Sequence, residues 1–157
     1  MIYRKTAKLF ESGAQIAAIL ANAAPGIEAA MARYGKHLGT AFQLIDDVLD
    51  YRADREALGK NLGDDLAEGK PTLPLIYALE RVDGPVREAI RRSIEQGSVE
   101  SLPEITAAIE STGGLAYTSR LARREASLAI EALADLPDSA YKQALRELAD
   151  FAVDRDR

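Results

Sequence analysis

The sequence contains no cysteine, no tryptophan and a single histidine among its 157 residues. Without cysteine, disulfides and thiolate metal sites are excluded, and the composition is compatible with a reducing compartment, so we expect a cytoplasmic protein. The N-terminal residues lack the continuous apolar core of a signal peptide. The sequence also has no run of about 18 apolar residues, the length that a membrane-spanning helix requires.

Basic residues are outnumbered, with 20 Lys and Arg against 25 Asp and Glu and a net charge of −5. A nucleic-acid-binding face needs a basic stripe, so we expect no nucleic-acid partner. Residues 46–70 hold eight acidic and four basic residues, which places a net charge of −4 in this one segment. Such local acidity is what a cation site would produce. The length and the hydrophobic fraction of 47% predict one globular domain over residues 1–157.

Apolar residues recur at helical spacing along the chain, and no segment alternates with the period of two that marks a strand. The pattern predicts an all-α fold. Glycine and proline separate the expected elements. The expected helices cover residues 2–22 and 27–54, from Pro71 or Pro74 to Val82, from Pro85 to Gln96, and residues 101–113, 114–135 and 138–154. Residues 55–70 are predicted to form a loop, and Ser101 with Glu104 has the spacing of a capping box.

Three carboxylates, Asp46, Asp47 and Asp50, follow a DDxxD pattern near the end of the expected helix 27–54. Because successive helical residues advance by about 100°, these acids share one side of the helix with Gln43 and lie opposite its apolar stripe. One interpretation is a solvated polar face, which is the most common use of a run of charges.

Two features of these acids favour a cation site instead. Asp46, Asp50 and Asp54 form a ladder of like charge at a spacing of four, and each such pair costs roughly 0.2–0.5 kcal/mol in an isolated helix. The acids also lie near the C-terminus of the helix, where the dipole disfavours anions. A bound divalent cation would offset both penalties. Mg²⁺ prefers oxygen ligands and bridges carboxylates to substrate phosphates, so we predict Mg²⁺ as the cofactor.

The segment 59–70 supports the same chemistry independently. Its three glycines allow a backbone to approach a ligand closely. Lys60 and Lys70 have the charge that phosphate oxygens attract, and Asp64 or Asp65 could complete the coordination of a cation. The alternative for this segment is a flexible surface loop of mixed charge.

Together these stretches resemble the C-terminal half of an all-trans polyprenyl diphosphate synthase of the octaprenyl type. The resemblance covers essentially the whole chain, and its two middle motifs are the most specific. The motifs are KTAKLFE at 5–11, YGKHLGTAFQLIDDVLDY at 34–51, GKNLGDDLAEGKPTLPLIYAL at 59–79 and GGLAYTSRLARREASLAIEAL at 113–133. The resemblance implies part of an all-α isoprenoid synthase bundle around a deep cavity, without its N-terminal helices.

The resemblance also implies a reaction in which Mg²⁺ ions hold an allylic prenyl diphosphate while it ionises and is extended by isopentenyl diphosphate. The residues that it assigns to the metal are Asp46, Asp47, Asp50 and Asp65. The residues that it assigns to the allylic diphosphate are Lys5, Lys60 and Lys70, and those near the reacting carbons are Thr6 and Gln43. Lys5, Thr6 and Gln43 form the catalytic set that it implies. A surface lysine and a packing residue are the plainer interpretations of Lys5 and Thr6.

The first aspartate-rich motif of the family and the upstream residues that bind isopentenyl diphosphate do not occur in these 157 residues. We therefore expect the chain alone to be inactive. Three interpretations stay open: a fragment of a full synthase, which the intact motif favours, a split-gene product that pairs with an N-terminal half, and a degenerate homologue that acts as a non-catalytic helical interaction subunit. We also expect the apolar faces of helices 2–22 and 27–54 to drive formation of a homo-oligomer.

Overall fold

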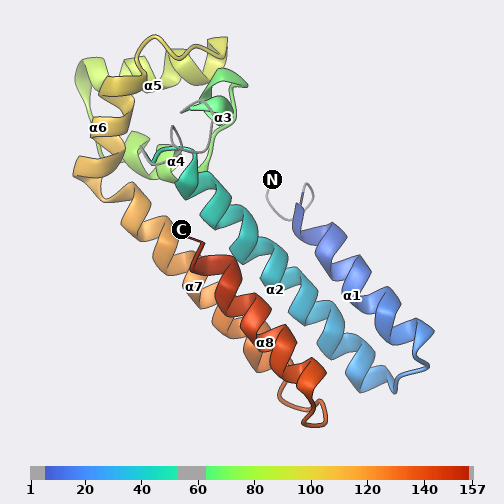
Figure 1. Cartoon of the computed structure of the whole chain (residues 1–157). Helices are drawn as coiled ribbons and strands as arrows, with labels where there is room; N and C mark the ends of the chain where they lie inside the picture. The colour runs from blue at the N-terminus through green and yellow to red at the C-terminus, as the bar shows by residue number, and fades with distance from the viewer. Residues whose placement is uncertain (1–5, 53–62, 156–157) are drawn as a thin grey trace. The chain divides into compact units, whose positions relative to one another are not determined.

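The computed structural model describes residues 6–52 and 63–155, which form α-helices and turns without a strand (Figure 1). The prediction of an all-α fold is confirmed. The helices are α1 (Lys8–Leu20), α2 (Pro25–Leu49), α3 (Asp64–Ala67), α4 (Leu73–Leu79), α5 (Gly84–Gln96), α6 (Leu102–Thr112), α7 (Gly114–Ala132) and α8 (Ala140–Val153). The chain divides into two compact units, one made of Met1–Ile45 with Arg120–Arg157 and the other of Asp46–Ser119. The single domain expected from the sequence stays a prediction.

The first unit packs α1, the larger parts of α2 and α7, and α8 around an apolar core (Figure 1). The buried residues of this core are Tyr34, Leu38, Ala129, Leu133, Ala149 and Ala152. Helices α1 and α2 approach closely because α2 carries Gly35 and Gly39 where α1 crosses it. A Cβ atom on Gly39 would lie 2.7 Å from the Cα of Ala7, so a larger residue there would push the helices apart.

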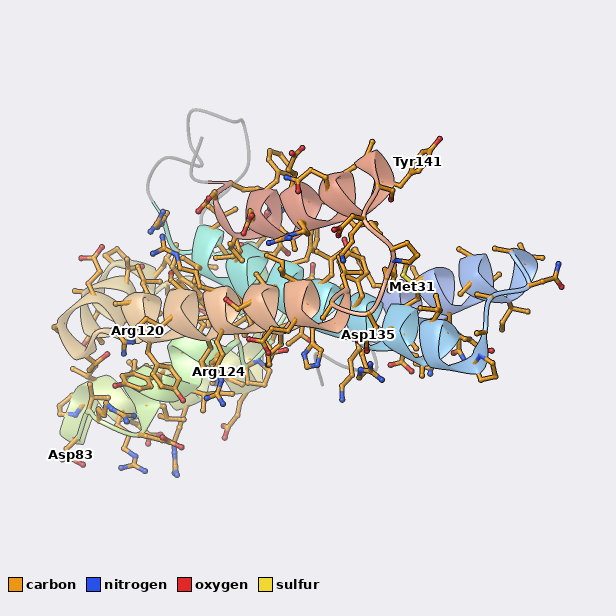
Figure 2. The ribbon with its side chains drawn as sticks, turned by 90° about the horizontal axis from the view of Figure 1, so that it is seen from below. Met31, Asp83, Arg120, Arg124, Asp135 and Tyr141 are labelled. Carbon is orange, nitrogen blue, oxygen red and sulfur yellow. The ribbon has the colours of Figure 1, made fainter. Side chains whose placement is uncertain are left out.

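Several apolar side chains of the first unit face solvent. Leu9, Ile16 and Leu20 fall on the apolar stripe that helical periodicity predicts for residues 2–22, yet they are 77%, 53% and 77% exposed. The apolar residues that mark the last helix in the sequence include Tyr141 and Leu148, and that helix is present as α8. Both residues are nevertheless exposed, and Tyr141 projects from the start of the helix with 84% of its surface exposed (Figure 2).

The second unit packs α3, α4, α5 and α6 with the last residues of α2 and the first turns of α7. Its core consists of Tyr51, Leu66, Leu75, Ala78, Ile90, Ile105, Ala108 and Ile109. Prolines occupy the first turns of α4, α5 and α6, where a missing N–H costs nothing. Gly97 and Gly113 end α5 and α6 in the left-handed conformation, with φ of 62° and 79°.

Four local features differ from the sequence-based prediction. Helix α2 begins at Pro25, since proline suits a first helical turn, and it ends at Leu49 rather than at residue 54. Helix α4 ends at Leu79 instead of Val82. The expected loop contains the short helix α3. Ser101, which lies within the described part of the chain, makes no side-chain hydrogen bond at the start of α6, so the predicted capping box does not form there.

Helix α2 ends where it does because the chain tightens after it. The amide of Tyr51 donates to the carbonyl of Val48 at 3.2 Å, and that of Arg52 donates to the carbonyl of Leu49 at 3.3 Å. These bonds span three residues instead of four, which closes the last turn. The turn directs the Tyr51 ring into the core of the second unit. Within the described ranges, no helix has the combination of length and apolar content needed to cross a membrane.

Candidate functional site

The carboxylates of the DDxxD pattern lie at the C-terminal end of α2, and solvent reaches little of them. Asp46 is half-buried, whereas Asp47 and Asp50 are only 4% and 2% exposed. The interpretation as a solvated polar face is therefore wrong for Asp47 and Asp50, which are buried. Burying a carboxylate is costly unless hydrogen bonds or cations compensate it, so the surroundings of these acids decide what they can do.

Asp50 is fixed by the segment that precedes α3. The amide of Gly63 donates to the carbonyl of Asp50 at 3.2 Å, and the amide of Asp65 donates to Oδ2 of Asp50, also at 3.2 Å. Gly63 has φ of 78°, and a Cβ atom on it would lie 2.8 Å from the Leu102 side chain, so glycine is required here. The DDxxD pattern and Asp65 are thus brought together, as the cation hypothesis needs.

Lys70 lies beside these carboxylates. Its Nζ donates to Oδ1 of Asp65 at 2.9 Å and forms an ion pair with Oε2 of Glu68 at 2.6 Å. Its amide donates to the carbonyl of Asp65 at 2.8 Å. The hydrogen bonds to Asp65 and then to Glu68 raise the pKa of Lys70 above its ordinary value. Lys70 is therefore an ammonium ion at neutral pH, next to an acidic cluster.

Two hydroxyl-bearing residues that the sequence analysis did not assign to the site lie next to it. Tyr51 is 2% exposed and Thr72 is 6% exposed, and Oγ1 of Thr72 donates to the Tyr51 hydroxyl at 3.2 Å. Burial, and then the charges of Asp50, Asp65 and Asp47, raise the pKa of Tyr51 above its usual range, which the Thr72 hydrogen bond partly opposes. The only sequence signal was their position, directly after Asp50 and two residues after Lys70.

Thr6 and Gln43 form a pair in the first unit. Oγ1 of Thr6 donates to Oε1 of Gln43 at 2.7 Å, and both side chains are half-buried. Thr6 precedes α1, and Gln43 lies on α2 beside Phe42, whose ring is 5.5 Å from that of Phe10. Arg155 donates to the carbonyl of Phe42 at 3.1 Å and places its guanidinium 4.0 Å from the ring centroid. The structure thus brings together the two residues expected near the reacting carbons.

Lys5 and Lys60, two of the three expected diphosphate ligands, lie outside the described residues, as does Asp54. The roles of all the site residues stay predictions. Among the described residues, no three carboxylate or histidine side chains are placed to hold a metal ion by themselves. The oxygen donors still fit Mg²⁺, because this ion keeps several waters and is bound through one or two carboxylates together with substrate phosphates.

The helices and the aspartate-rich turn have the fold of solved isoprenyl synthases. A polyprenyl synthase from Caulobacter crescentus CB15, complexed with calcium and isoprenyl diphosphate, matches with a TM-score of 0.90 and 41% identity over 99% of this chain and 48% of that one. A decaprenyl diphosphate synthase from Rhodobacter capsulatus matches with a TM-score of 0.89 and 38% identity, over 99% of this chain and 49% of the other.

The chain belongs to the polyprenyl synthetase family, whose model matches residues 1–111. The octaprenyl diphosphate synthase of Escherichia coli K12 is 51% identical over 100% of this chain and 49% of its own length. The corresponding enzyme of Haemophilus influenzae is 50% identical over 99% of this chain and 48% of its own length. The chain therefore spans about half the length of the curated relatives that it matches, consistent with the C-terminal half that its motifs resemble.

Proposed function

We propose that the chain supplies the Mg²⁺ and allylic-diphosphate subsite of a prenyltransferase that extends an allylic diphosphate with isopentenyl diphosphate. The observation that carries the proposal is the hydrogen-bonded series Asp50, Asp65 and Lys70. It places carboxylates for a hard cation beside an ammonium group for phosphate. The names of the relatives, and the isoprenyl diphosphate and calcium in the Caulobacter crescentus structure, support the same chemistry.

In this proposal, Asp46, Asp47 and Asp50 hold the metal, and Asp65 assists them. Bound Mg²⁺ would supply positive charge that stabilises the departing diphosphate. Lys70 would also stabilise the departing diphosphate, because its ammonium attracts the phosphate oxygens as negative charge accumulates on them. The carboxylates of Asp65 and Glu68 hold that ammonium in place until a diphosphate competes for it.

Thr6 and Gln43 have a different role in the proposal. Their oxygens are the negative ends of bond dipoles, and oxygens facing a carbocation stabilise it. The Thr6 hydroxyl donates to the Gln43 carbonyl oxygen, which fixes the orientation of both dipoles. Lys5, one residue earlier, completes the catalytic set that the resemblance implies.

The chain carries one aspartate-rich motif, so we propose that it does not elongate a prenyl chain alone. A second candidate function, a non-catalytic helical interaction subunit or degenerate homologue, is favoured by the exposed apolar residues of α1. The two candidates differ in what they require of the carboxylates. The interaction subunit needs no metal, whereas the diphosphate subsite does. The cytoplasmic location stays a prediction.

Thermal unfolding with and without Mg²⁺ plus pyrophosphate tests the proposal. A ligand at about 100 times its Kd adds about 2.7 kcal/mol of stability, which raises Tm by roughly 5–10 °C for a domain of this size. We expect this shift in the wild type, its loss in Asp46→Ala, and its retention in Asp135→Ala, which removes an exposed acid in the turn after α7 (Figure 2). The absence of a shift in the wild type would favour the interaction subunit.

A further inference from the structure

We infer that Tyr51 and Thr72 are positioning residues that set the separation of Asp50 and Lys70. The inference rests on the proposed diphosphate subsite. Tyr51 directly follows Asp50 in the chain, and Thr72 follows Lys70 by two residues. Oγ1 of Thr72 donates to the Tyr51 hydroxyl at 3.2 Å. One side-chain bond thus links the segment that carries the metal ligands to the segment that carries the phosphate ligand.

Other hydrogen bonds return from this pair to the carboxylates and complete a ring. The amide of Asp65 donates to Oδ2 of Asp50 at 3.2 Å, and Nζ of Lys70 donates to Oδ1 of Asp65 at 2.9 Å. The amide of Thr72 donates to the carbonyl of Lys70 at 3.0 Å. The ring closes through Tyr51, which is covalently joined to Asp50. Because each link is made, neither Asp50 nor Lys70 can shift without breaking one of them.

The Tyr51–Thr72 bond joins two buried side chains of this ring. Tyr51 and Thr72 are 2% and 6% exposed, whereas the Lys70 side chain is 25% exposed. The Tyr51 ring packs in the core with Leu66 and Leu75, which come from α3 and α4. Close-packed interiors resist displacement. The ring of hydrogen bonds is therefore anchored at this end, while the Lys70 ammonium of the same ring is partly exposed and can be reached by a ligand.

The two hydroxyls serve something other than packing. A phenylalanine would fill the core volume of Tyr51 almost equally well, but it would leave the Thr72 hydroxyl without its acceptor in a buried position, which is unfavourable. Since both side chains are buried, they act through Asp50 and Lys70. Substituting them should therefore change the affinity for a diphosphate without removing any of its ligands.

Calorimetric titration of the full chain with pyrophosphate in the presence of Mg²⁺ tests this positioning role of Tyr51 and Thr72. We expect Tyr51→Phe and Thr72→Val each to weaken binding about tenfold, which corresponds to about 1.4 kcal/mol. Thr72→Ser keeps the hydroxyl and should retain wild-type affinity. The double variant Tyr51→Phe with Thr72→Val should lose no more than either single variant, because both changes remove the same bond.

Tyr34→Phe is the matched control. The Tyr34 hydroxyl donates to the carbonyl of Leu145 at 2.8 Å, and the residue is 2% exposed and belongs to the first unit. The Tyr34→Phe variant should lower Tm about as much as Tyr51→Phe does and leave the affinity for pyrophosphate unchanged. Wild-type pyrophosphate affinity in Tyr51→Phe, or an equal loss of affinity in Tyr34→Phe, would overturn the inference and leave the proposed function intact. If the wild type itself does not bind pyrophosphate with Mg²⁺, the proposed function fails and the inference fails with it.

Discussion

The backbone amide of Asp65 donates to the carboxylate of Asp50 at 3.2 Å. This bond joins the DDxxD pattern to the acidic segment that follows it, although the two residues are 15 positions apart. It uses a main-chain donor, so the contact persists when the Asp65 side chain changes. The side chain of Asp65 is thereby available for Lys70, which it contacts at 2.9 Å.

Asp50→Asn should distinguish the contribution of the Asp50 charge to ligand binding from the contribution of its hydrogen bond to stability. Asparagine keeps an oxygen that can accept from the Asp65 amide, so we expect Tm of the unliganded chain to be unchanged or higher, because like charges near Asp47 and Asp65 are reduced. Affinity for pyrophosphate with Mg²⁺ should fall at least about tenfold, the effect that even an outer-shell change has on a metal site. Calorimetry and thermal unfolding measure the two quantities. Undiminished affinity would count against a role of Asp50 at the metal.

Glu68→Gln should strengthen pyrophosphate binding, because Glu68 competes with phosphate for Lys70 at 2.6 Å. The Glu68 side chain is 64% exposed, and an exposed ion pair is worth about 0–1 kcal/mol, so the gain should be at most about fivefold. The control is Glu80→Gln, an equally exposed glutamate that pairs with Arg81 and should have no effect. A titration that shows weaker binding in Glu68→Gln would mean that Glu68 supports the site.

Tyr34 should make the first unit sensitive to alkaline pH. Burial raises the pKa of Tyr34 from 10.0 to about 12. Between these values the unfolded chain has lost the phenolic proton and the folded chain retains it, so the free energy of unfolding falls as pH rises. At about 1.36 kcal/mol per pKa unit, the loss is on the order of 2–3 kcal/mol. Denaturant unfolding between about pH 9 and pH 12 should therefore show a shallower decline in Tyr34→Phe.

Tyr141→Phe provides the comparison for that measurement, since Tyr141 is 84% exposed and its substitution should leave the pH profile of the wild type unaltered. An identical decline in Tyr34→Phe and the wild type would show that other groups cause the alkaline loss.

Self-association should depend on the outer face of α1, where Leu9, Ile16 and Leu20 are exposed. Contiguous apolar surface of this kind usually marks an interaction site. We expect sedimentation velocity at micromolar concentration to show species larger than a monomer, and Leu9→Ser with Leu20→Ser to shift them toward the monomer. Phe151→Ser, at an exposed apolar residue of α8, should have a smaller effect. A compact wild-type monomer would contradict the prediction of a homo-oligomer.

Local signals in the sequence were sufficient for much of the fold. The prolines at 74, 85 and 103 and the glycines at 97 and 113 act through their own backbone geometry, so the starts of α4, α5 and α6 and the ends of α5 and α6 followed from their positions. The placement of the acids near the end of α2 could also be predicted, because it depends only on the helical periodicity of that segment.

The burial of the acids could not be predicted in that way. A helical wheel shows which residues share a side, but what covers that side comes from elsewhere in the chain, as α3 does for Asp50. The Tyr51–Thr72 bond joins residues 21 positions apart, and neither residue type signals it locally. The exposure of Tyr141 and Leu148 also depends on the neighbours of α8 and not on its own periodicity.

Gly35 and Gly39 give α2 a surface without side chains where α1 lies against it, with the Cα of Ala7 only 2.7 Å from the position of a Cβ atom on Gly39. Thr6 immediately precedes Ala7, and its hydroxyl reaches Gln43 at 2.7 Å. The reach of a threonine hydroxyl is short, so the Thr6–Gln43 contact exists only while the two backbones stay this near. A methyl group added at Gly39 would therefore push the two backbones apart and separate Thr6 from Gln43, although neither of these residues had been changed.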